Sequence, residues 1–429
     1  MAVLYFLALR TKAKNSNNFL YQQYYLKGLN YKFIGAVVFA LVYVYYYGGG
    51  DTVSFYYAIS PLFKLFFKDP GAFLKFCLNP YEFYPPECIW EAAQKSVIYL
   101  LRGTPTLTTI KIGGIINMFC FNSYLVLSLV FAYISYQFQW RIFTLVCSVY
   151  PSLHKQFSYA LLMIPSVIFW GSGLSKDTIM LSAIMMFVYA YYQMVINKRQ
   201  VMKYLFILIL TGYLISLVRG FILFTTVPCL IIMTVTYYQN AIQSSALRFL
   251  AAPLFITVGI IGSVLFVRTL GQNVDSYSVE SLQQKAEGFR SWHTTQGGST
   301  YSIGEGELEF TFSGIMSQAP MALITTLYGP FIWQIRNILM LLSGIESIVF
   351  LYLTFRMVFN KRIYALFGVL FSDHLIAFCL PFILILSIAI GLTSFNYGAL
   401  VRYKIPIMPF LGIFFIVVNY HLNRSEQSA

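Results

Sequence analysis

The chain has 429 residues, of which 58% are hydrophobic and only 10% are charged, and its net charge at pH 7 is +14. Soluble domains carry about 25% charged residues, so the composition excludes a soluble globular protein. Its apolar runs are continuous and do not alternate in segments of about 10 residues, which excludes a transmembrane β-barrel. The predicted fold class is therefore all-α: a polytopic helical membrane protein with about ten transmembrane helices.

The first 32 residues contain five basic side chains and no acidic one. Because the cytoplasmic flanks of membrane spans are enriched in Lys and Arg, residues 1–32 are predicted to form a cytoplasmic N-terminal segment. The first span is expected at about 33–47, where a Tyr-rich end suits the membrane interface. A run of three glycines and then Asp51 follow, and this topology puts them on the outer side.

Residues 48–112 are predicted to form the first external loop. Within it, residues 52–80 are rich in aromatic side chains with spaced lysines, and the stretch is interrupted at Pro61 and Pro70. This pattern is typical of helices that lie along the membrane interface rather than cross it. We therefore expect interfacial helices directly after Asp51.

Nine further spans are predicted from the apolar runs, and the eighth of these is either one long span or a broken one. They lie near residues 113–136, 156–173, 178–196, 203–218, 221–239, 249–267, 337–355, 364–392 and 405–421. A hydrophilic insertion at 268–319 belongs to a large external loop, 268–336, and residues 422–429 form a cytoplasmic tail. The chain from 33 to 421 is thus predicted to be one transmembrane domain.

The charge distribution fits this topology. The proposed cytoplasmic segments hold 15 of the 29 basic residues and one acidic residue, whereas the external segments hold 14 basic and 12 acidic residues. The positive excess is therefore explained by membrane orientation, and a nucleic acid partner is not needed to explain it. The six cysteines and four histidines show no metal-ligand spacing, so neither a metal nor another cofactor is predicted.

Three residues near predicted helix starts are candidates for an outer-face site. Asp51 follows glycines that allow close backbone approach, so its carboxylate is either a general base or an ordinary interfacial group. Lys176 and Asp177 follow a Gly-Ser-Gly turn. That turn either offers backbone N–H groups and a cation to an anion, or Ser175 simply caps a helix whose first turn favours Asp177.

Basic residues elsewhere on the predicted outer face are candidate ligands of a lipid phosphate. Arg219 is either such a ligand or an arginine that extends to the interface. Arg402 and Lys404, with Tyr403 between them, immediately precede the last span. A basic pair on the outer side is unusual, and two cations at the interface suit a phosphate or pyrophosphate.

Two acidic residues fall within the proposed spans, and no basic residue does. Glu346 and Asp373 are functional candidates by position, although Glu346 could equally bond a neighbouring helix and Asp373 could lie at a cytoplasmic edge. The absence of basic residues from the proposed spans argues against a polar path across the membrane.

Several of these stretches resemble membrane glycosyltransferases. A span that ends in Gly-Gly-Asp, followed by aromatic interfacial segments, resembles the first external loop of C-type glycosyltransferases, which take sugars from polyprenyl-phosphate carriers. This resemblance implies that Asp51 is the catalytic base. The segment Arg402-Tyr403-Lys404-Ile405-Pro406-Ile407-Met408-Pro409-Phe410 resembles the Arg-Tyr-Arg-x-Pro-x-x-Pro pattern of bacterial members. Residues 169–177 and 327–333 resemble stretches of bacterial polysaccharide proteins, including Wzy-like polymerases.

The expected function is thus an enzyme of the bacterial inner membrane, a glycosyltransferase or polysaccharide polymerase with its site facing the periplasm. Its expected partners are a sugar donor on undecaprenyl (pyro)phosphate, a glycan or lipid-linked acceptor, and the lipid bilayer. Asp51 would be catalytic, and the phosphate or substrate would be bound by Arg402, Lys404, Arg219, Lys176, Asp177 and Tyr403. Two alternatives stay open: a flippase or transporter of lipid-linked oligosaccharide, and a non-catalytic subunit of an envelope machine.

Overall fold

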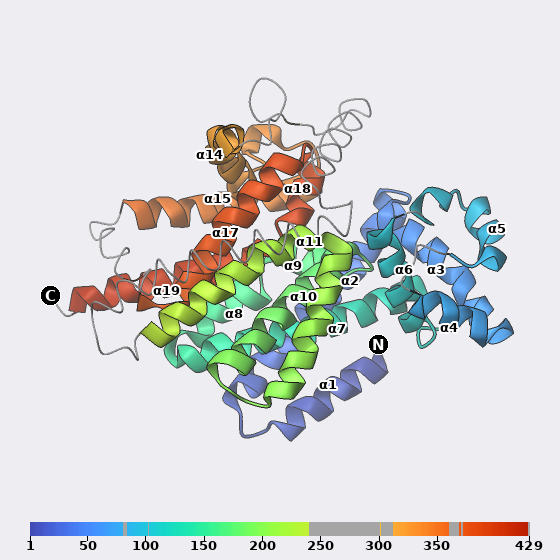
Figure 1. The fold of residues 1–429 in the computed structure, drawn as a ribbon, viewed down its shortest axis with the longest axis horizontal. Coiled ribbons are helices and arrows are strands. Elements are labelled where there is room, and N and C mark those ends of the chain that lie inside the picture. Colours follow the sequence, from blue (N-terminus) through green and yellow to red (C-terminus); the bar gives the residue numbers. More distant parts are fainter. Residues whose placement is uncertain are drawn as a thin grey trace. The chain divides into compact units, whose positions relative to one another are not determined.

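The computed structural model describes residues 1–79, 84–101, 103–239, 301, 312–359, 369 and 372–427. Every secondary-structure element in these residues is a helix (Figure 1), which confirms the predicted all-α class for this part of the chain. The chain forms two compact units. Unit 1 comprises Met1–Ala190 and Gln200–Gly220, and unit 2 comprises Tyr191–Arg199 and Phe221–Ala429.

Six helical segments of the described chain are long and apolar enough to cross a membrane. They are Tyr21–Tyr46, Lys176–Ile196, Val201–Gln239, Ile338–Val358, His374–Thr393 and Ile407–Arg424. A helix needs about 20 apolar residues to span a bilayer, so these segments support a membrane protein. They do not confirm the predicted count of about ten.

The lower count has identifiable causes. Two helices that match the predicted spans 203–218 and 221–239 meet at a kink at Arg219, and they count together as α11 (Val201–Gln239). The predicted spans 113–136 and 156–173 are each divided between two helices. The predicted span 249–267 lies outside the described residues, as does most of the insertion at 268–319.

The first membrane-length segment also begins earlier than predicted. It joins two short π-helical turns to α2 (Leu26–Leu41), so the continuous helical segment starts at Tyr21 rather than near residue 33. Lys32 is consequently inside a candidate span, where it is 1% exposed. The statement that no basic residue lies within a span is therefore wrong.

Unit 1 is built from two groups of helices. In one group, α2 packs against α7 and α9; in the other, α3 packs against α4, α5 and α6. The helices of unit 1 are α1 (Ala2–Lys14), α2, α3 (Asp51–Lys68), α4 (Pro70–Leu78), α5 (Pro86–Gln94), α6 (Thr104–Asn117), α7 (Tyr124–Val149), α8 (His154–Leu162), α9 (Pro165–Trp170), most of α10 (Lys176–Tyr191) and the first part of α11.

Close helix packing in unit 1 depends on small residues. A Cβ added to Gly35 of α2 would lie 2.3 Å from the backbone oxygen of Ile168 in α9, and one added to Gly113 of α6 would lie 2.3 Å from the side chain of Ile59 in α3. Real Cβ atoms do not approach that closely, so glycine is required where these helices cross. The sequence thereby sets the position of α3, the helix that starts at Asp51.

Unit 2 packs α14 (Phe312–Tyr328) against α17 (His374–Thr393), and α17 against α19 (Ile407–Gln427), while α15 (Ile338–Val358) contacts α14, α18 (Tyr397–Tyr403) and α19. Three of these helices start with a side-chain cap. Asn337, Asp373 and Asn396 each accept a hydrogen bond from a backbone N–H of the first turn. Asp373 is thus the cap of α17, which agrees with the alternatives that the predicted span 364–392 is broken and that Asp373 lies at an edge.

Candidate functional site

The start of α3 is shaped by three glycines with positive φ. Gly48, Gly49 and Gly50 have φ of 63°, 153° and 103°, which side-chain-bearing residues rarely adopt. Tyr43 closes the preceding helix by accepting a hydrogen bond from Gly49 N–H at 2.9 Å. The turn leaves Asp51 exposed in the first turn of α3, where the helix dipole favours a carboxylate.

Lys176, another predicted site residue, lies close to this end of α3. Its ammonium is 5.5 Å from the ring centre of Phe55 and donates a hydrogen bond to Thr106 Oγ1 at 2.8 Å. Phe55 is one helical turn beyond Asp51, about 6 Å along the axis. The starts of α3, α6 and α10 are therefore neighbours in unit 1.

A chain of aromatic side chains connects the same two regions on a second route. Tyr43 packs beneath Gly50 and has its ring centre 6.3 Å from that of Trp170, the last residue of α9. The carbonyl of Trp170 accepts a hydrogen bond from Thr178 Oγ1 in the first turn of α10 at 3.2 Å. The glycine turn before Asp51 and the start of α10 are thus braced against each other.

The loop before α10 is buried rather than open. Ser172, Gly173, Leu174 and Ser175 are all buried, and a Cβ added to Gly173 would lie 2.1 Å from the ring of Phe39. Packing against α2 therefore explains this glycine. Ser175 Oγ accepts a hydrogen bond from Thr178 N–H at 3.1 Å, which confirms the predicted cap.

Asp177 and Arg219, which are 42 residues apart in sequence, form a buried ion pair. The Arg219 Nη2 to Asp177 Oδ1 distance is 2.6 Å, and the side chains are 11% and 0% exposed. Arg219 leaves helical geometry, with φ of −153° and ψ of 77°, at the kink of α11. The pair fixes this kink to the first turn of α10, next to Lys176.

The sequence indicated for each residue of this pair separately that a buried charge would need a partner. A buried charge is retained where a partner of opposite charge compensates for its desolvation, and both residues flank apolar runs. Their pairing depends on the kink at Arg219, for which the adjacent Gly220 is the local sequence signal. Thr106 and Phe55, the partners of Lys176, carried no signal in the sequence.

The late basic motif belongs to unit 2, and its two cations differ in environment. Arg402 and Tyr403 are partly exposed at the end of α18. Lys404 is 1% exposed and donates hydrogen bonds to the Gly329 carbonyl at 2.7 Å and to Ser347 Oγ at 3.2 Å. Burial lowers the pKa of Lys404 to about 8, against a raising effect of the Glu346 carboxylate.

Lys404 therefore joins three segments of unit 2. Its ammonium links the end of α18 to Gly329 and to α15, and Ser347 Oγ itself donates to the Gly329 carbonyl at 3.1 Å. This arrangement holds Arg402, two residues earlier, in a fixed position. Glu346, predicted either as a functional acid or as a partner of a neighbouring helix, lies beside this cation and is 7% exposed.

Lys32 is a buried cation that the sequence analysis placed in the cytoplasmic segment. Its ammonium donates to the Val167 carbonyl at 3.2 Å. In the sequence, the only indication that Lys32 lies within a helix was its place five residues after Lys27 in a helical segment. Among the described residues, no group of three or more His, Cys, Asp and Glu side chains is placed to hold a metal ion.

Comparisons of the chain with protein-family models, with curated proteins and with solved structures find no match. The observations that bear on function are therefore the arrangement of residues in unit 1 and the motifs of the sequence.

Proposed function

We propose that this protein is a glycosyltransferase or polysaccharide polymerase of the bacterial inner membrane, which uses a sugar donor on undecaprenyl (pyro)phosphate at its periplasmic face. The observation that supports this proposal is the grouping of Asp51, Lys176 and the Asp177–Arg219 pair around neighbouring helix starts in unit 1. An exposed carboxylate and a partly exposed cation near the same end of α3 suit transfer to a hydroxyl with departure of a phosphate.

In the proposed reaction, Asp51 accepts the proton of an acceptor hydroxyl as its oxygen attacks the anomeric carbon of the donor sugar. The bond from the anomeric carbon to the phosphate oxygen breaks, and the electron pair leaves with the phosphate or pyrophosphate. Direct displacement inverts the anomeric configuration. Lys176 neutralises the charge that develops on the leaving oxygen.

The Asp177–Arg219 pair has a positioning role in this proposal. Because Asp177 is fully buried against Arg219, the pair fixes the first turn of α10 and so the backbone that carries Lys176. In unit 2, Arg402 and Tyr403 are proposed to contact a lipid phosphate. Lys404, bound to Gly329 and Ser347, holds the segment that carries them.

The proposal is tested by replacing Asp51 with Asn in the full chain reconstituted in proteoliposomes. General-base catalysis contributes about 10²–10⁴-fold, so sugar transfer from the polyprenyl-linked donor should fall by at least about 100-fold. Asp69→Asn is the matched control, because Asp69 is also an exposed carboxylate at a helix start, where it caps α4. Full transfer by the Asp51→Asn protein, with its helical content intact, would show that Asp51 is not the base.

Glycan analysis of a deletion strain distinguishes the two enzyme classes. Loss of a polymerase leaves single repeat units on the lipid carrier, whereas loss of a single-sugar transferase leaves a truncated glycan.

A second candidate function is translocation of a lipid-linked oligosaccharide. The observation that favours it is that Lys32, Arg219 and Asp177 are charged residues inside candidate spans. Intramembrane charges mark transport paths in many membrane proteins. A transporter should lose movement of labelled lipid-linked sugar across the vesicle membrane in Lys32→Met and should retain it in Asp51→Asn. The proposed enzyme should instead lose sugar transfer in Asp51→Asn and retain it in Lys32→Met.

A further inference from the structure

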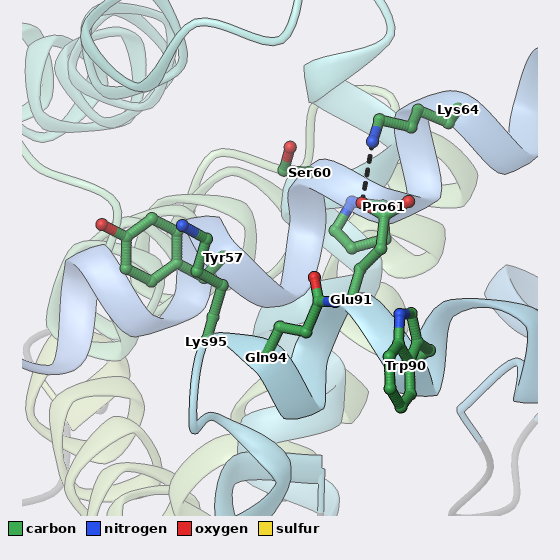
Figure 2. A pocket seen from close by; sticks show the side chains of 8 residues that line it. All are labelled: Tyr57, Ser60, Pro61, Lys64, Trp90, Glu91, Gln94 and Lys95. Atoms are coloured by element: carbon green, nitrogen blue, oxygen red, sulfur yellow. Dashed lines mark hydrogen bonds and ion pairs between the residues drawn. The ribbon is translucent and has the colours of Figure 1, made fainter.

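A second polar feature of unit 1 lies between α3 and α5. A pocket of about 390 Å³ is bounded by residues from the middle of α3 and from the end of α5 and the turn after it. The residues that line it are Tyr57, Ser60, Pro61, Lys64, Trp90, Glu91, Gln94 and Lys95 (Figure 2). The volume is in the range of small-molecule sites.

The two helices present matching polar faces to this pocket. On α3, positions 57, 60, 61 and 64 repeat at the spacing of one helix face, and on α5 and the following turn positions 90, 91, 94 and 95 do the same. Lys64 Nζ and Glu91 Oε2 are 2.9 Å apart across the pocket, as Figure 2 shows. This exposed pair joins the two walls, and such pairs contribute little to stability.

The aromatic side chains in the pocket are unusually accessible. Trp90 is 71% exposed, although a tryptophan is normally among the most buried residues of a protein. Tyr57 forms the opposite end, with the ammonium of Lys95 5.2 Å from its ring centre. An exposed indole, a phenol ring, an amide and a carboxylate on facing walls are the groups that bind sugars: rings stack on the C–H faces, and the polar groups bond hydroxyls.

The charges of the lining add a further requirement. Two ammonium groups, Lys64 and Lys95, face one carboxylate, Glu91. Lys64 is paired with Glu91, and Lys95, which is exposed and lies over the Tyr57 ring, is the cation that an anionic group of a ligand can reach. A saccharide with a carboxylate group supplies that balance and also offers C–H faces to the aromatic rings.

The pocket is separate from the start of α3. Tyr57 follows Asp51 by six residues, which places it about 9 Å along the helix and roughly 120° around it. The pocket and the Asp51 carboxylate therefore open on different sides of α3. A ligand in the pocket is held without taking part in chemistry at Asp51.

We propose that the α3–α5 pocket is a binding site for an acidic saccharide, with its ring stacked on Trp90 and its carboxylate bound by Lys95. Only the role of this ligand rests on the proposed function: the ligand is a segment of the acceptor or of the growing glycan. The binding itself does not require Asp51.

The test uses the full chain in nanodiscs on an array of oligosaccharides of two to four units, printed as pairs that differ only in one carboxylate. Binding is expected on the acidic members. Trp90→Ala should weaken it by about tenfold or more, and Lys95→Gln should remove the preference for the acidic member of each pair. The matched controls are Trp333→Ala, which removes an indole that is 80% exposed, and Lys75→Gln, which removes an exposed charge on α4.

Three outcomes would overturn the proposal: no glycan is bound, Trp90→Ala binds as tightly as the parent chain, or neutral and acidic members bind equally. A fourth outcome is quenching of the Trp90 fluorescence by brominated lipid. The Trp90 signal is the difference between the parent chain and Trp90→Phe, and its quenching would show that the indole anchors the protein in the membrane interface. Asp51→Asn should bind the array as the parent does. If the protein binds the acidic glycans but transfers no sugar, the binding proposal stands and the proposed function is wrong.

Discussion

Removal of one partner from the Asp177–Arg219 ion pair should destabilise unit 1 strongly. The Nη2 to Oδ1 distance is 2.6 Å, and the Asp177 side chain is fully buried. When one partner of a buried pair is removed, the other charge is left without compensation, at a cost of about 3–5 kcal/mol. Asp177→Asn and Arg219→Met should each lower the free energy of unfolding by this amount, a factor of about 10² to 5 × 10³ in the folding equilibrium.

The same geometry predicts that the two changes are not additive. Asp177→Asn combined with Arg219→Met removes both charges, so the double variant should be more stable than the sum of the single effects implies, by about 2 kcal/mol or more. The exposed pair between Lys64 and Glu91 is the matched control, and Glu91→Gln should cost less than about 1 kcal/mol.

The assay is reversible unfolding of the purified protein in mixed micelles, followed by tryptophan fluorescence over a denaturant series. The free energy in each variant comes from linear extrapolation, and the four proteins form one double-mutant cycle. Single variants that each lose less than about 1 kcal/mol, or losses that add within about 0.5 kcal/mol, would refute the buried pair and its role at the kink of α11.

Three further predictions test other features. The pKa of Lys404 is about 8, below its ordinary 10.5, so the unfolded chain binds a proton between these pH values that the folded chain does not. Stability should therefore rise by about 3 kcal/mol from pH 8 to 10.5, and titration of unfolding should show this rise absent from Lys404→Met. Gly35→Ala should lower the melting temperature, because its Cβ would lie 2.3 Å from the Ile168 carbonyl, and overpacking costs about 1–3 kcal/mol. Gly48→Ala meets no atom within 4 Å and should cost only about 1–2 kcal/mol, from its positive φ.

The helical class and most helix positions followed from hydropathy because apolar length is a direct requirement of a bilayer. The predicted segments 337–355 and 405–421 differ by only a few residues from α15 and α19. The predicted boundary between 203–218 and 221–239 coincides with the kink at Arg219, where two helices meet within α11. A charge at the middle of a long apolar run indicates either a loop or a kink, and composition alone does not distinguish them.

The candidate site was less predictable than the fold. The glycines before Asp51 were predicted to allow close approach of the backbone to a ligand, and the positive φ of all three was not predicted. The burial of Asp177 with Arg219 was not predictable, since ion pairing depends on two helices that meet only in the folded unit. Lys404 was predicted to face a phosphate, and its burial depends on Gly329 and Ser347, which are distant in sequence.

The proposal that Asp51 is the base depends on the residues near the start of α3 rather than on Asp51 alone. Asp51 is exposed in the first turn of α3, and Lys176 lies near the same end of this helix. In the proposed reaction, Asp51 accepts the hydroxyl proton while Lys176 neutralises the charge on the leaving phosphate. Lys176→Met should therefore slow transfer from donors with poor leaving groups more than from donors with a pyrophosphate.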